Sequence, residues 1–206
     1  GINESINFIG VGFNASNARN IGINWLKEKY KSLLEDHFIW FADDDCFYPS
    51  NKNILIIMDE LKKEKIILCR LKDCEKDKYV GQFYPSNIPF QNLSSLIYGA
   101  PSIITNLSIT CNFDENIGPG SKYFSAEDSD FLLRIFPLNK FKVKISKANL
   151  YHPLLPNNFQ KLYKYGIGQG YLFRRMISGY YEIKIYSTII FSIYLYILRP
   201  LLGLCL

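Results

Sequence analysis

The chain has 206 residues, which suits one domain of ordinary size with an appendage. Its residues are 48% hydrophobic and 16% aromatic, enough to build a sizeable core, and its formal net charge is +5. The five cysteines are odd in number and include no Cys-x-x-Cys pair, which argues against a disulfide framework and against a cysteine-based zinc site. Free thiols fit a reducing cytosol.

The net charge is concentrated at the carboxyl-terminal end. Residues 1–156 carry 18 Lys and Arg against 18 Asp and Glu, whereas residues 157–206 carry six bases and one acid. The same final segment holds 11 of the 30 Phe and Tyr residues. A basic, aromatic tail beside a neutral domain indicates a membrane surface as the partner rather than nucleic acid.

Helices and strands are expected to alternate along the first part of the chain. Ser16 or Asn17 can cap the first helix. The run Phe38–Phe41 is apolar throughout, which predicts a strand buried on both faces. In chain order we expect a helix to about residue 35, a strand at 38–41, a helix over about 51–64 and a strand at 66–69.

The second part continues the alternation. Residues 84–105 are rich in Pro, Asn and Ser and receive no assignment. Ser125 is expected to cap a helix that Pro137 ends. The other expected elements are a strand ending at 111–113, strands at 142–145 and 149–151, and an amphipathic helix over 157–178. This pattern predicts an α/β domain with a mostly parallel sheet.

Three adjacent carboxylates follow the predicted strand at 38–41. They are Asp43, Asp44 and Asp45. In open α/β sheets ligands bind at the carboxyl ends of strands, and Mg²⁺ or Mn²⁺ takes oxygen ligands together with phosphate oxygens. The spacing Asp43-x-Asp45 therefore predicts a divalent-cation site. The alternative is a solvated acidic turn that caps the next helix.

Three segments resemble family-two glycosyltransferases of the GT-A fold. FIWFADDDCFYP (38–49) resembles the family's strand and Asp-x-Asp motif, and NASNARNIGINWL (14–26) resembles the helix start that precedes it. FDENIGPGSKYFSAEDSDFLLRI (113–135) resembles the acceptor loop and Glu-Asp motif. The segments occur in the family's order and span about residues 14–135. The resemblance implies a partial GT-A fold, a Rossmann-like sheet with flanking helices.

The resemblance also implies the chemistry. Asp43 and Asp45 would hold Mn²⁺ or Mg²⁺ on the diphosphate of a nucleotide-sugar, and His152 would be a further metal ligand, although a lone His is often structural. Asp128 would be the base that deprotonates the acceptor hydroxyl, so the transfer would invert the sugar. The alternative for Asp128 is a carboxylate that interacts with the helix dipole.

Other residues are implied in substrate binding. Asp44 would contact ribose or sugar, or cap the next helix, and Glu127 would bind acceptor or orient its loop. Arg19 and Asn20 match the family's Arg-Asn pair, with a structural role as the alternative for Arg19. Gly118 and Gly120 would belong to a flexible lid near the acceptor, or else to a surface turn.

The family's first nucleotide-binding strands are not recognisable in residues 1–12. The sequence is therefore expected to be an amino-terminally truncated piece or a degenerate copy, with a GT-A domain over 1–156 and an extension over 157–206. In that tail, YGIGQGYLFRR (165–175) and LRPLLG (198–203) resemble segments of the carboxyl-terminal extension of bacterial surface-polysaccharide transferases. This resemblance implies a lipid-linked saccharide acceptor and a location at the cytoplasmic face of the inner membrane, peripheral or partly inserted.

Two other functions remain open on the sequence. A metal-dependent sugar-phosphate nucleotidyltransferase could also use acidic pairs at strand ends, although it would usually show a Gly-rich phosphate loop near its start. A non-catalytic, membrane-associated relic of a transferase is the second. For the tail, the alternative is an ordinary carboxyl-terminal helix packed on the domain.

Overall fold

The structure is a computed structural model. It describes residues 14–43, 45–48, 50–79, 100–139, 142–153 and 159–181. Its elements are α1 (Ala15–Lys29), η1 (Leu34–Asp36), β1 (Phe38–Trp40), α2 (Asn51–Leu61), β2 (Ile66–Asp73), η3 (Ala100–Ser102), β3 (Ile103–Asn106), α3 (Glu127–Leu138), β4 (Lys144–His152) and α4 (Phe159–Ile177).

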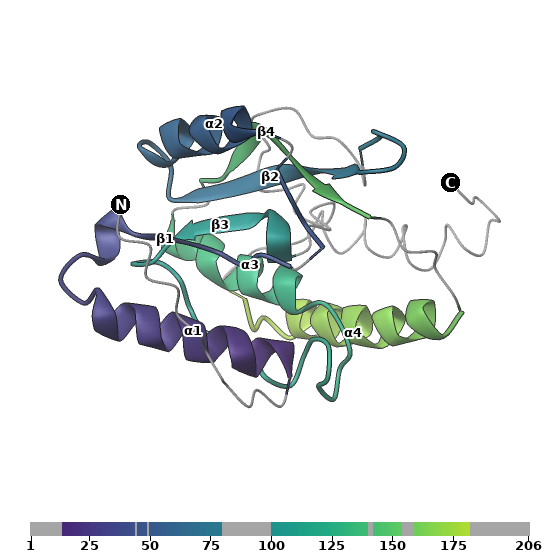
Figure 1. Cartoon of the computed structure of the whole chain (residues 1–206). Helices are drawn as coiled ribbons and strands as arrows, with labels where there is room; N and C mark the ends of the chain where they lie inside the picture. The colour runs from purple at the N-terminus through teal and green to yellow at the C-terminus, as the bar shows by residue number, and fades with distance from the viewer. Residues whose placement is uncertain are drawn as a thin grey trace.

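The described strands form one mixed sheet in the order β1-β3-β2-β4 (Figure 1). β2 and β4 run parallel, whereas β3 is antiparallel to both β1 and β2. The α/β class is confirmed, but the expectation of a mostly parallel sheet is wrong for the described strands. The reason is that the direction of β3 depends on the path of the chain before it, which residue pattern does not encode.

Helices cover both faces of the sheet (Figure 1). Side chains alternate along β2, so that Ile66 and Leu68 pack with Phe131 of α3 on one face, whereas Ile67 and Cys69 pack with the α2 side on the other. Full burial of one such aliphatic side chain stabilises the fold by about 2 kcal/mol. The sheet and the helices on its two faces therefore form three layers. Packing between these layers fixes the positions of the strand ends.

β1 differs from its prediction as a strand buried on both faces. It pairs with β3 and lies at an edge of the described sheet, and Trp40 is 37% exposed. The Trp40 indole N–H donates a 2.5 Å hydrogen bond to the Pro101 carbonyl. An apolar run can therefore occupy an edge strand as well as a central one, so apolar character alone does not predict burial on both faces.

The helix starts differ from the predicted caps. Asn14, rather than Ser16 or Asn17, caps α1, since its side chain accepts from the Asn17 N–H at 2.8 Å. Ser125 does not cap α3, because its hydroxyl donates to the Tyr165 carbonyl at 3.1 Å. The Ser16 hydroxyl is likewise engaged outside its own helix, since it donates to the Ile117 carbonyl at 2.7 Å.

The remaining boundaries also shift. α1 ends at Lys29 rather than near residue 35, and α2 ends at Leu61. Residues 111–113 are a loop, whereas the strand of that region is β3. β4 is one strand that replaces the two expected at 142–145 and 149–151, with a register shift opposite Leu68 and Arg70 of β2.

Helix α4 packs against α3 through a buried ionic centre. Asp130 is fully buried and accepts hydrogen bonds from Arg134 at 2.8 Å, Arg175 at 2.8 Å and Tyr181 at 2.6 Å. Burial and the neighbouring carboxylate raise the pKa of Tyr181, so its phenol stays a donor. Arg175 also pairs with Asp114, which ties the loop before α3 to the same centre.

The part of the tail predicted to be most apolar, residues 185–198, lies outside the described residues. Within the described ranges, no helix has both the length and the apolar character that crossing a bilayer requires.

Replacing Asp130 by Asn tests the ionic centre. Arg134 and Arg175 would lose a shared counter-charge, so we expect a loss of unfolding free energy on the order of 3 kcal/mol. Urea denaturation monitored by circular dichroism measures it. Asp59→Asn removes an exposed pair with Lys62 and is the matched control, expected to change little. Equal stability of the two variants would contradict the assigned role.

Candidate metal centre

A backbone pairing brings the acidic turn to the end of β4. Phe47 and Tyr151 exchange two main-chain hydrogen bonds, of 3.0 and 2.9 Å, and their rings stack. His152 follows Tyr151 as the last residue of β4. Residues 45 and 152, more than a hundred positions apart in the chain, are thereby held side by side.

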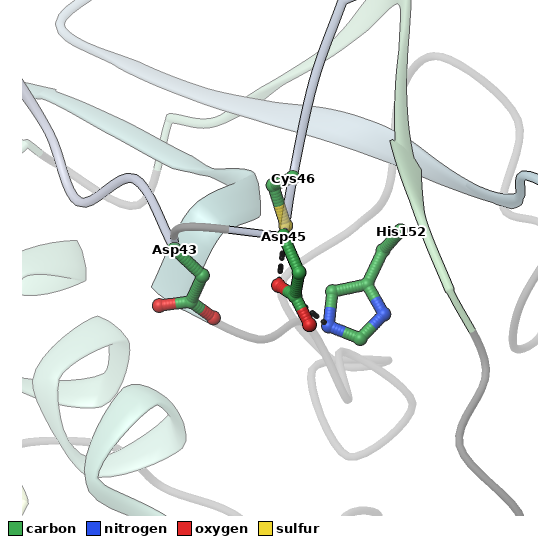
Figure 2. A group of neighbouring side chains, drawn as sticks. All are labelled: Asp43, Asp45, Cys46 and His152. Carbon is green, nitrogen blue, oxygen red and sulfur yellow. Dashed lines mark hydrogen bonds and ion pairs between the residues drawn. The ribbon is translucent and has the colours of Figure 1, made fainter.

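Four side chains converge at this point (Figure 2). One ligand atom each from Asp43, Asp45, Cys46 and His152 lies within 4.8 Å of all the others. The His152 Nε2 is 3.5 Å from the Asp45 Oδ1. Two carboxylates, an imidazole and a thiol are all ligand types of divalent metals, so this cluster could hold a metal ion.

A tight turn brings the side chains of Asp43, Asp45 and Cys46 close together. The Cys46 N–H donates to the Asp43 carbonyl at 3.2 Å, and the Cys46 Sγ lies 3.8 Å from the Asp45 Oδ1. Burial, together with the charges of Asp43 and Asp45, raises the pKa of Cys46 to about 12. The thiol is therefore protonated at neutral pH, and a cation would have to displace that proton.

Arg19 of α1 joins this cluster to the start of α3. Its guanidinium lies 3.8 Å from the Asp43 carboxylate, 3.2 Å from that of Glu127 and 3.5 Å from that of Asp128. Arg19 is therefore a common neighbour of Asp43, a predicted metal ligand, and Asp128, the predicted base. Three carboxylates around one guanidinium leave excess negative charge when the acids are ionised, which favours a cation.

The backbone at the start of α3 is held in an unusual conformation. Ala126 has φ of +77°, a left-handed value that costs a non-glycine residue energy. The following residues are Glu127, which is 6% exposed, and Asp128, whose side chain is 19% exposed. The strained turn therefore directs two carboxylates toward Arg19 from the first turn of the helix.

Asn20 holds the loop before α3. Its amide accepts from the Phe113 N–H at 2.6 Å and donates to the Phe113 carbonyl at 3.0 Å. It also donates to the Glu115 carboxylate at 3.0 Å, and its residue is 5% exposed. The Asn20 amide therefore positions this loop. Asn20 directly follows Arg19 in α1.

Gly118 and Gly120, the glycines predicted to form a lid, lie in a loop whose main chain is hydrogen-bonded to α1. The Ser16 hydroxyl donates to the Ile117 carbonyl at 2.7 Å, and the Ala15 N–H donates to the Pro119 carbonyl at 3.2 Å. Gly118 has φ of +107°, and a Cβ there would meet Glu127 and Ser16 at 3.0 Å. Gly120 also has positive φ. Gly118 thus permits close approach of the loop to Glu127.

The structure brings most of the predicted site residues together. Asp44 lies outside the described residues. Cys46 joins the cluster but was not among the predicted metal ligands, because it has no Cys-x-x-Cys partner in the sequence. The signal was its position directly after the acidic triplet.

Helix α4 braces the loop that leads to Glu127 and Asp128. Gly168 contacts Ser125 so closely that a Cβ would lie 2.2 Å from the Ser125 carbonyl oxygen. The rings of Tyr123 and Tyr171 stack with centroids 3.9 Å apart. The candidate catalytic turn is therefore packed between α1 on one side and α4 on the other.

No protein-family model matches this sequence, and no curated protein sequence matches it either.

Gly168→Ala tests the bracing of this turn. The added methyl cannot fit against Ser125, so we expect a loss of about 1–3 kcal/mol of unfolding free energy. Gly166→Ala and Gly170→Ala in the same helix are matched controls, since a Cβ at either meets nothing within 4 Å. Alanine favours helix, so these controls should stabilise by up to about 1 kcal/mol. Denaturant titrations that rank all three variants alike would refute the contact.

Proposed function

We propose that this chain belongs to a metal-dependent, inverting glycosyltransferase. It would move a sugar from a nucleotide-diphosphate sugar to a hydroxyl of a saccharide acceptor, lipid-linked and used in surface-polysaccharide synthesis. The observation that carries the proposal is the meeting of Asp43 and Asp128 at Arg19, at 3.8 and 3.5 Å. Transfer needs its cation and its base in one place, and the two residues are far apart in the sequence.

The donor set supports a cation in this role. Asp43, Asp45 and His152 supply two carboxylates and an imidazole within 4.8 Å. A divalent ion held there would stabilise negative charge on the departing nucleoside diphosphate. The carboxylates are also close enough to repel one another, so a compensating cation is physically favoured.

Asp128 suits the role of base. It lies at the first turn of α3, and its side chain is 19% exposed. The packed loop and Arg19 restrict the directions in which its carboxylate can point, and a base must be held at a defined distance from the proton that it takes. Glu127 is more buried and accepts a 3.2 Å hydrogen bond from Arg19, so it serves better to hold that guanidinium.

The first half of α4 supports a membrane surface as partner. Phe159 is 82% exposed, Tyr163 is 64% exposed and Leu162 is 53% exposed, and Lys161 and Lys164 are close to them in the helix. Aromatic and basic side chains together are typical of a lipid headgroup region. The second half of the helix packs on the domain, so the exposed half would bring the site close to a lipid-linked acceptor.

Asp45→Asn should abolish divalent-dependent transfer while leaving the fold intact. The amide cannot supply the charge that the cation needs. Release of nucleoside diphosphate from a panel of nucleotide-sugars, with Mn²⁺ and with a chelator, measures the loss. Asp36→Asn, an exposed acid at the opposite end of β1, is the control. Full activity of Asp45→Asn would reject the metal assignment.

Asp128→Asn should bind the donor normally but turn over roughly 10²–10⁴-fold more slowly, because an amide cannot accept the acceptor proton. Calorimetry with the nucleoside diphosphate and Mn²⁺ measures binding, and initial rates at saturating donor measure turnover. A weakened donor affinity with unchanged turnover would place Asp128 in donor binding instead.

A further inference from the structure

The turn after β1 brings a thiol to the candidate metal centre that the proposed function does not use. We propose that Cys46 is a ligand of the cation, and that it makes the site prefer Mn²⁺, Co²⁺ or Zn²⁺ to Mg²⁺. This inference rests on the metal site of the proposed function, and it is independent of the reaction performed there.

The distances fit coordination to one ion. The Asp45 Oδ1 lies 3.5 Å from the His152 Nε2 and 3.8 Å from the Cys46 Sγ. In a tetrahedral site with ordinary ligand distances, neighbouring ligand atoms lie about 3.3–3.6 Å apart. Small side-chain rotations would therefore suffice to place the oxygen, the nitrogen and the sulfur around the same ion.

The backbone holds the thiol in this position. The Cys46 N–H donates to the Asp43 carbonyl at 3.2 Å, and the next residue, Phe47, is hydrogen-bonded to Tyr151 in β4. These bonds fix the chain on both sides of Cys46 and keep it beside His152. The sulfur is thus positioned by the same pairing that unites the rest of the cluster.

The donor set determines which metal fits best. Mg²⁺ demands near-octahedral oxygen coordination and gives up water reluctantly, so a thiol and an imidazole contribute little to its binding. Mn²⁺, Co²⁺ and Zn²⁺ accept nitrogen and sulfur ligands more readily. On binding, the S–H bond of Cys46 is replaced by a sulfur–metal bond and the proton passes to solvent. The mixed set of Asp43, Asp45, Cys46 and His152 therefore selects against Mg²⁺.

A packing role is the competing explanation for Cys46. The side chain is partly buried against the core cluster that contains Ile67 and Ile104. Buried thiols often act as small apolar groups. Packing would produce no metal-dependent spectroscopic signal, so a spectrum separates the two roles.

Cobalt is the probe for the test, used without nucleotide. We expect Co²⁺ to produce a thiolate-to-cobalt charge-transfer absorption in the near ultraviolet that saturates when metal and protein are equimolar. Cys46→Ser should lose this band and bind Co²⁺ at least roughly tenfold more weakly, while its Mg²⁺ affinity stays nearly constant. Cys111→Ser, which makes the same change at a thiol beside Arg134, is the matched control and should keep the band.

The outcomes separate this inference from the transferase proposal. Cobalt bound without the band, or a band that persists in Cys46→Ser, overturns the role of Cys46 and leaves the metal site standing. No binding of Co²⁺, Mn²⁺ or Mg²⁺ overturns both. A Cys46-dependent band in a protein that releases no nucleoside diphosphate from any nucleotide-sugar upholds Cys46 and refutes the transferase.

Discussion

The guanidinium of Arg19 lies between carboxylates that come from two distant parts of the chain. Asp43 follows β1, whereas Glu127 and Asp128 begin α3, and without a cation between them these acids would repel one another. The guanidinium also lies over the ring of Phe113, 5.2 Å from its centroid. Because Phe113 is buried in the core below the sheet, the position of the charge cluster depends on the packing of that core.

The surrounding elements hold this arrangement from two sides. Asn20 and Ser16 of α1 bind the main chain of the loop before α3, and α4 contacts that loop through Gly168 and Arg175. The buried carboxylate of Asp130 joins α4 to α3 and leaves the carboxylate of Asp128, half a turn earlier, for the cluster. The start of α3 therefore places one acid in the buried ionic centre and another beside Arg19.

The candidate metal centre combines side chains of different chemical character. Asp43 and Asp45 are hard oxygen donors, whereas Cys46 and His152 offer sulfur and nitrogen. This set of side chains differs from the all-oxygen coordination that Mg²⁺ prefers.

Local pattern was sufficient to predict the α/β class, most of the helices, and the acidic residues at the strand end, because periodicity and composition are properties of short segments. Asp43, Asp45 and His152 could be chosen from the sequence for their chemical types and their resemblance to a family. The mixed sheet, the edge position of β1 and the strained turn at Ala126 could not, since each depends on contacts between residues far apart in the chain. The same holds for the meeting of Cys46 with His152 and for the position of Arg19 between the acids. The pairing of Phe47 with Tyr151 and the packing of α1 bring these side chains together. No pattern within a short segment of the sequence indicates such contacts.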